Sequence, residues 1–261
     1  MMSNDLPIQL VTLDLYDTLI ELVPPRWERL GKALRSLGIE ANDEALKQGD
    51  LAGEDYWTEM NTLHPMRDRP EEERGRIRDE FIRRWLAVAG IEVSDTEATA
   101  IRHAYRAEYE QPAHAAVPGL IDGYRTFGDV NRTMQRLRVA GVLTAIISNA
   151  DADVTEFCTR LQFAHEMDLI VTSALIGYEK PDVRTFRAAL DPLGIKPDRA
   201  LHIGDQPRSD VVGALATGMR AALIDRYARH SASDHAVPVF LTLDSLVDHV
   251  LSVNKQVESL R

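Results

Sequence analysis

The residues of this 261-residue chain that are best suited to chemistry are carboxylates that follow short apolar runs. Asp14 ends the run Ile8–Leu13, and Asp205 and Asp210 come after the run Ala200–Ile203. Three carboxylates brought together repel one another unless a cation lies among them. Oxygen ligands without His or Cys favour a hard ion, above all Mg²⁺, which commonly bridges to a phosphate oxygen. The spacing therefore predicts a Mg²⁺ site that could bind a phosphorylated molecule.

Two other apolar runs end in residues that could bind the same anion. Ser148 and Asn149 follow the run Val142–Ile147, and Lys180 lies in the loop after Leu169–Thr172. A hydroxyl and backbone N–H groups just before a helix can hold an anionic oxygen, and a lysine adds a positive point charge. The assembly suits attack by an aspartate on phosphorus, with the metal and the lysine neutralising the developing charge.

These residues need a scaffold that gathers strand ends at one edge. Near-continuous apolar runs that alternate with helical patterns indicate a parallel sheet covered on both faces, in which ligands bind beyond the carboxyl ends of the strands. We therefore expect an α/β fold with a doubly wound parallel sheet. The predicted strands are Ile8–Leu13, Val142–Ile147, Leu169–Thr172, Ala200–Ile203 and Ala221–Ile224.

The sheet is interrupted after its first strand by a segment of different character. From Pro24 to about Gln111 the charge density is high, the apolar spacing is helical, and no convincing strand occurs. We expect an all-helical cap domain of three to five helices over residues 23–114, inserted into a core made of residues 1–22 and 115–261. One helical face, which ends before Gly38, consists of Trp27, Leu30, Ala33, Leu34 and Leu37.

Four segments, taken in order, resemble the four motifs of the haloacid dehalogenase-like (HAD) hydrolase superfamily. They are residues 13–19 (LDLYDTL), 146–149 (IISN), 180–182 (KPD) and 204–205 (GD) followed by Asp210. The resemblance spans Val11 to about Ile224. It implies a Rossmann-like HAD core, and the helical cap after the first motif is typical of the subfamily that includes haloacid dehalogenases, phosphoglycolate phosphatases and phosphonoacetaldehyde hydrolase.

The resemblance also assigns a role to each candidate residue. It implies a Mg²⁺-dependent hydrolase in which Asp14 is the nucleophile and forms an aspartyl-phosphate with a small phosphorylated metabolite. The implied catalytic residues are Asp14, Ser148 and Lys180, the implied substrate-binding residues are Thr18 and Asn149, and the implied metal ligands are Asp14, the Tyr16 carbonyl, Asp205 and Asp210.

The chain departs from the phosphatase pattern at one position, and this leaves three functions open. Tyr16 stands where HAD phosphatases usually have a second aspartate that protonates the leaving group. A phosphatase that favours good leaving groups is one interpretation, with Asp17 as a less favourably oriented proton donor. Tyrosine is also what metal-independent 2-haloacid dehalogenases have at this position, although those enzymes lack the Asp205 and Asp210 arrangement. A HAD-fold binding protein that has lost catalysis is the third interpretation.

Composition narrows the partners further. The formal charge of −11 argues against a nucleic-acid or anionic-membrane surface, but it does not exclude a small anionic substrate. The residues Met1–Asp5 show no basic signal region, and no apolar run approaches the length of a membrane span, so we expect a cytoplasmic protein. The single Cys158 excludes an intramolecular disulfide and is expected to pack within a helix. We expect a monomer or a homodimer.

Overall fold

The computed structural model describes residues 6–110, 119–230 and 235–259. The chain forms two compact units, one of Met1–Glu21 with Arg125–Arg261 and the other of Leu22–Tyr124. We call them the sheet unit and the helical unit. The boundary expected between residues 114 and 115 lies outside the described residues.

The sheet unit is built on six parallel strands in the order β5-β4-β1-β6-β7-β8. Leu13 lies opposite Ile146 on one side and Ile203 on the other, so the strands β1, β4 and β6 end side by side. This register gathers the residues that follow them at one edge of the sheet. The strands are β1 (Leu10–Leu13), β4 (Leu143–Ser148), β5 (Leu169–Thr172), β6 (Ala200–Gly204), β7 (Arg220–Ile224) and β8 (Val239–Phe240).

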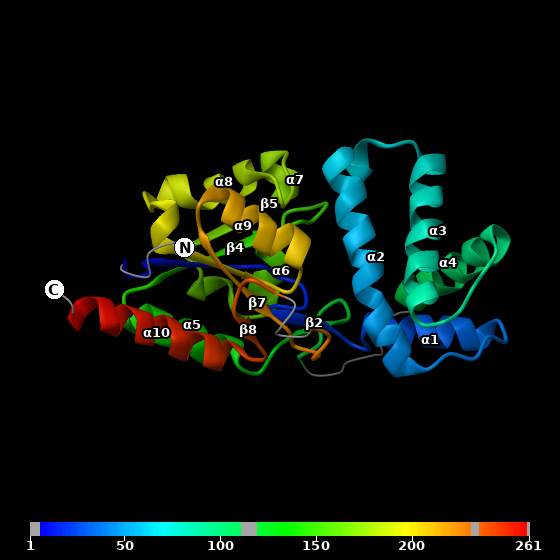
Figure 1. Ribbon diagram of the computed structural model, residues 1–261, viewed down its shortest axis with the longest axis horizontal. Coiled ribbons are helices and arrows are strands. Elements are labelled where there is room, and N and C mark those ends of the chain that lie inside the picture. The colour runs from blue at the N-terminus through cyan, green and yellow to red at the C-terminus, as the bar shows by residue number, and fades with distance from the viewer. Residues whose placement is uncertain (1–5, 111–118, 231–234, 260–261) are drawn as a thin grey trace. The chain divides into compact units, whose positions relative to one another are not determined.

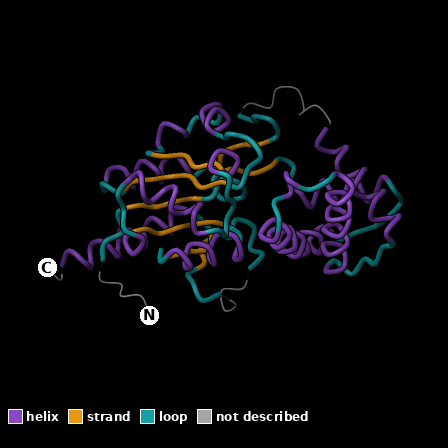
Figure 2. Tube along the Cα trace, turned by 90° about the horizontal axis from the view of Figure 1, so that it is seen from above, coloured by secondary structure: helices purple, strands orange, loops and turns teal. Residues whose placement is uncertain are grey.

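Helices cover both faces of this sheet, as expected for a doubly wound fold. Figure 1 shows α8 and α9 on one side of the strands and α5 and α10 on the other, and Figure 2 shows the strands side by side between helices. Buried apolar side chains such as Leu10, Ile147 and Phe186 fill the layer under α8 and α9. The covering helices are α5 (Val130–Val139), α8 (Val183–Leu193), α9 (Val212–Thr217) and α10 (Leu243–Ser259).

Shorter elements complete the connections. β2 (Ile20–Leu22) and β3 (Tyr124–Thr126) pair as a separate two-stranded sheet, and α6 (Thr155–Arg160) and α7 (Ser173–Ile176) are short helices. Cys158 is fully buried in α6, as the sequence predicts. Single helical turns span Met66–Asp68, Ala164–Glu166, Pro197–Arg199 and Pro207–Val211.

The helical unit confirms the prediction of an inserted all-helical segment. α2 packs closely on α3, because a Cβ atom on Gly49 would lie 2.3 Å from the Trp85 carbonyl oxygen. The Trp85 indole donates a hydrogen bond of 2.5 Å to the Leu46 carbonyl, which satisfies its buried N–H. The helices are α1 (Arg26–Ser36), α2 (Asp43–Leu63), α3 (Glu71–Val88) and α4 (Asp95–Glu110).

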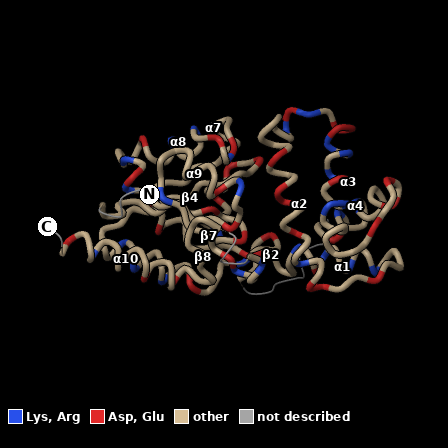
Figure 3. The backbone as a smooth tube through the Cα atoms, viewed as in Figure 1, with Lys and Arg blue, Asp and Glu red and all other residues tan. Residues whose placement is uncertain are grey.

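Charged residues of both signs are interspersed along α3. Figure 3 shows this along α3, where Arg76 and Arg84 form ion pairs with acidic residues one turn earlier. Such pairs on an exposed helix contribute little each to the stability. None of the helices in the described part of the chain is both long and apolar enough to cross a membrane.

Candidate active site

A buried lysine joins two of the carboxylates that the sequence singled out. Asp14 follows β1 directly, Asp210 follows β6 by one turn, and Lys180 comes from the loop between α7 and α8. The Lys180 Nζ atom lies 2.5 Å from Asp14 Oδ1 and 2.6 Å from Asp210 Oδ1. All three residues are at most 8% exposed. Ion pairs this well shielded are not weakened by solvent as surface pairs are.

The three groups strongly influence one another's ionisation. Burial raises the pKa of Asp14 to about 7, against the opposing attraction of Lys180. Burial also opposes the charge on Asp210, but Lys180 and a bond from His202 hold the pKa of Asp210 well below its usual range. Burial alone would lower the pKa of Lys180, yet the two carboxylates raise it well above its ordinary value. Lys180 is therefore a permanent cation in this site.

Asp210 is fixed by a second chain of hydrogen bonds that the sequence prediction missed. The His202 Nε2 atom lies 3.2 Å from Asp210 Oδ1, and the Gln206 backbone N–H donates to Asp210 Oδ2 at 3.0 Å. An ionised Asp210 needs a donor from Nε2, so Nδ1 accepts the bond of 2.8 Å from the Thr12 hydroxyl. The available signal was one polar residue inside the otherwise apolar strand β6.

Gly204 leaves the space that the Asp210 carboxylate occupies. A Cβ atom on Gly204 would lie 2.1 Å from Asp210 Cγ, which is far closer than two carbon atoms can approach. The last residue of β6 must therefore lack a side chain for Asp210 to reach Lys180. The glycine of the fourth motif has a steric role in this chain.

The predicted anion-binding residues divide into two groups. The hydroxyl oxygens of Ser148 and Thr18 are buried and have no hydrogen-bond partner among the described residues. A buried hydroxyl without a hydrogen-bond partner destabilises the folded protein. Both hydroxyls are therefore suited to donate a hydrogen bond to an anionic oxygen of a ligand. The Asn149 amide instead donates to the Lys180 carbonyl at 3.0 Å and accepts from the Lys180 N–H at 2.8 Å. Asn149 thus holds the lysine loop through both ends of its amide.

The turn after Asp14 sets the positions of Tyr16 and Asp17. The Leu19 N–H donates to the Leu15 carbonyl at 2.9 Å, and Asp17 has a left-handed φ of 54°. Asp residues tolerate this conformation better than most. The Asp17 Oδ1 atom accepts a hydrogen bond of 3.2 Å from the Tyr227 hydroxyl. Burial, and then the charge of Asp14, raise the pKa of Tyr16 to about 12.

The fourth-motif carboxylate Asp205 lies apart from the lysine. It is 3% exposed, and burial followed by the nearby charge of Asp17 raises its pKa well above the usual range. The Arg229 Nη2 atom opposes this shift from 3.2 Å, and the charge of Asp14 adds to it. Asp205 and Asp14 are thus close enough to interact through their charges.

The residues present fit Mg²⁺ by donor type. Within residues 6–110, 119–230 and 235–259, no three His, Cys, Asp or Glu side chains form a group that could hold a metal ion by themselves. Mg²⁺ usually keeps several waters, however, and needs only one or two carboxylates besides its substrate's oxygens. Asp14 and Asp205 supply two carboxylates, and the Tyr16 carbonyl belongs to the same turn. Asp210, with three donors on its two oxygens, retains one acceptor position on Oδ2.

Comparison with known proteins identifies relatives over most of the chain. Human haloacid dehalogenase-like hydrolase domain-containing protein 3 is 27% identical over 85% of this chain and 84% of its own length. Glyceraldehyde 3-phosphate phosphatase of Methanothermobacter thermautotrophicus is 34% identical, over 42% of this chain and 50% of its own. A putative phosphoglycolate phosphatase structure from Lactobacillus delbrueckii subsp. bulgaricus covers 94% of this chain and 99% of its own, with a TM-score of 0.60 and 15% identity.

The structural likeness shows the fold alone, because the identity is low. The sequence-family model gives more, since the description haloacid dehalogenase-like hydrolase matches residues 8–218. This range contains all four motif segments, from Asp14 to Asp210. The chain therefore belongs to the haloacid dehalogenase-like hydrolases.

Proposed function

We propose that this hydrolase is a Mg²⁺-dependent phosphatase of a small phosphorylated metabolite and that Asp14 is its nucleophile. The observation that carries the proposal is the buried Lys180 ammonium, bonded to both Asp14 and Asp210 beside the end of β4. The archaeal relative supports the substrate class, because it is named for its action on glyceraldehyde 3-phosphate, a small phosphorylated metabolite.

The side chains divide the work as follows. An Asp14 carboxylate oxygen attacks phosphorus, the bond from phosphorus to the ester oxygen breaks, and an aspartyl-phosphate forms on Asp14. Water then attacks this phosphorus and releases inorganic phosphate, which restores the carboxylate. Ser148 and Thr18 offer their unsatisfied hydroxyls to the phosphoryl oxygens, and Lys180 neutralises charge that develops on them. Mg²⁺ would supply further positive charge for the same oxygens. Its ligands would be Asp14, the Tyr16 carbonyl, Asp205 and Asp210.

The leaving group receives little help from the residue next to the nucleophile. A phenol with a pKa of about 12 is a poor general acid near neutral pH, where an acid with a pKa close to the working pH is best. Asp17 is bonded to Tyr227 in the turn. We therefore propose that the enzyme prefers esters or anhydrides whose leaving oxygen is stable as an anion, such as acyl or aryl phosphates.

The experiment is a turnover panel with matched variants. Purified protein is assayed with acetyl phosphate, p-nitrophenyl phosphate and several alkyl phosphates, with Mg²⁺ and with EDTA. Acyl and aryl phosphates should be cleaved faster than alkyl phosphates, only with Mg²⁺, and Asp14→Asn should abolish the activity. Tyr16→Asp should raise alkyl phosphatase activity, whereas Tyr16→Phe should leave the preference unchanged.

Tyr16 itself favours a second function, and the same panel separates the two. Attack by Asp14 on carbon with loss of halide needs no proton donor, so tyrosine is compatible with a 2-haloacid dehalogenase. Chloride release from 2-chloropropionate in EDTA, without phosphate release from any ester, would replace the phosphatase proposal. Binding of Mg²⁺ without turnover on any member of the panel would favour a binding protein.

A further inference from the structure

The site contains a second buried cation that the proposed chemistry does not use. Arg229 is 7% exposed, and its Nη2 atom lies 3.2 Å from Asp205 Oδ2. The other buried cation, Lys180, forms ion pairs with Asp14 and Asp210. Each of the two fourth-motif carboxylates, Asp205 and Asp210, is thus paired with a buried cationic side chain.

Arg229 is held in place by the loop that follows β7, residues Asp225–His230, which we call the β7 loop. The Asp225 carboxylate accepts hydrogen bonds from the backbone N–H groups of Arg229 at 2.9 Å and His230 at 2.8 Å. The His230 ring lies 3.3 Å from the Asp205 carbonyl oxygen. The guanidinium therefore comes from a loop whose next side chain, that of His230, contacts the metal-motif segment.

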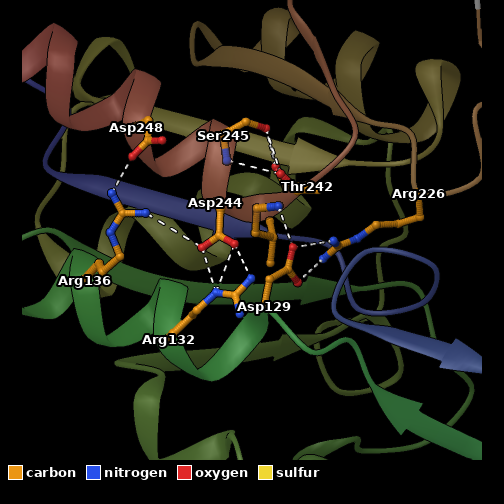
Figure 4. Close-up of polar contacts among 9 residues, drawn as sticks. Asp129, Arg132, Arg136, Arg226, Thr242, Asp244, Ser245 and Asp248 are labelled. Carbon is orange, nitrogen blue, oxygen red and sulfur yellow. Dashed lines mark hydrogen bonds and ion pairs between the residues drawn. The ribbon is translucent and has the colours of Figure 1, made fainter.

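The same loop is anchored to the turn that contains the nucleophile. The Arg226 guanidinium donates to the Thr18 carbonyl at 2.8 and 3.1 Å. Figure 4 shows the same guanidinium paired with the Asp129 carboxylate, which also accepts a hydrogen bond from the Leu243 N–H at the start of α10. The Tyr227 hydroxyl also donates a hydrogen bond to the Asp17 carboxylate. The β7 loop thus contacts both segments that supply the candidate metal ligands.

A cationic side chain fixed beside a metal ligand affects metal binding in two ways. It attracts the Asp205 carboxylate, so the buried charge is compensated when no metal is bound. It also repels a divalent cation that approaches the same carboxylate, and this repulsion is strong in a site shielded from solvent. Both effects favour the metal-free protein relative to the metal-bound one.

We propose that Arg229 is the resident counter-ion of Asp205 and that it lowers the affinity of the site for Mg²⁺. This inference rests on the proposed metal site, and Arg229 is a positioning residue in it. The β7 loop makes the metal-free site stable, and it makes Mg²⁺ binding weak and readily reversible.

The test measures Mg²⁺ binding without substrate, by calorimetric titration of the 261-residue chain. Arg229→Gln keeps a hydrogen-bonding side chain and removes the charge, and Arg229→Lys keeps the charge. Arg132→Gln is the matched control, because it removes a positive charge from a surface pair with Asp244 in the same unit. Arg229→Gln should bind Mg²⁺ about tenfold more tightly, which corresponds to about 1.4 kcal/mol. Arg229→Lys and Arg132→Gln should bind with an affinity close to that of the wild type.

A second measurement does not depend on metal. In EDTA, Asp205→Asn should lower the Tm, because it removes the negative charge that pairs with the buried Arg229 guanidinium. The double variant Asp205→Asn, Arg229→Gln should have a higher Tm than Asp205→Asn alone. Additive effects of the two substitutions on Tm would overturn the pairing, even if Arg229→Gln alone proves too unstable to titrate. Equal Mg²⁺ affinity of wild type and Arg229→Gln would overturn the role of Arg229 and leave the phosphatase proposal intact. No Mg²⁺ binding by either protein would overturn the metal site and the inference together.

Discussion

Replacing Lys180 with methionine tests the central contact of the site, because methionine has a similar length and no charge. The Coulomb attraction of Nζ to oxygens 2.5 and 2.6 Å away is about 6 to 7 kcal/mol for each contact at an effective dielectric constant of 20. Most of this attraction is offset by the cost of burying the charges. Removing one partner of a buried pair typically destabilises a protein by about 3–5 kcal/mol, since the other partner stays buried and uncompensated.

The expected loss of stability can be measured as a fall in the melting temperature, Tm. For a unit of about 150 residues, 1 kcal/mol corresponds to about 2–4 °C, so Lys180→Met should lower the Tm in EDTA by about 6–20 °C. Mg²⁺ should reverse part of this loss by compensating Asp14. The kcat on acetyl phosphate should fall at least about 100-fold. Calorimetry and phosphate release give the two measurements, with the exposed Lys196→Met as the control. A Tm in EDTA within about 2 °C of the wild type would refute the reasoning, because no uncompensated carboxylate would then exist.

Three further substitutions or reactions test other parts of the site. Gly204→Ala should displace Asp210 and reduce phosphatase activity at least about 100-fold, whereas Gly128→Ala, which has open space around it, should not; equal activities in the two variants would contradict the close approach to Asp210. Asn149→Ala removes both bonds to the Lys180 backbone, and we expect kcat to fall about tenfold with a small change in KM; a change in KM alone would assign Asn149 to substrate binding instead. Cys158 is buried and burial raises its pKa to about 12, so a chromogenic disulfide reagent at pH 8 should label it only after denaturation; rapid labelling of the native protein would show that α6 opens.

The sheet could be predicted from the sequence because its strands are short, apolar and followed by polar residues. Asp14, Lys180 and Asp210 were predicted to meet for the same reason, since parallel strands end at one edge. The Val239–Phe240 strand was missed because two residues carry no periodicity.

The missed part of the site consists of contacts that no local pattern encodes. His202 is a polar residue in an apolar strand, and only the fold shows that it bonds Thr12 and Asp210. Arg229 lies 24 residues after Asp205 in a polar loop of ordinary composition. The amide of Asn149 is hydrogen-bonded to the Lys180 backbone 31 residues away, a contact that the sequence did not predict, and its predicted contact with substrate stays a prediction. Such pairings depend on the path of loops in space, which spacing along the chain does not determine.

The position of β1 in the middle of the sheet has a consequence for synthesis on the ribosome. β1 pairs with β4 and β6, yet the helical unit separates Leu13 from its partner β4, which begins at Leu143. At about 5–20 residues per second, an apolar strand must wait roughly 7–26 s for its first neighbour to emerge. The helical unit, which ends at Tyr124, is synthesised during this interval. Until β4 arrives, both edges of β1 are open to other chains or to a chaperone, so the strand that precedes the proposed nucleophile is exposed to misassembly during synthesis.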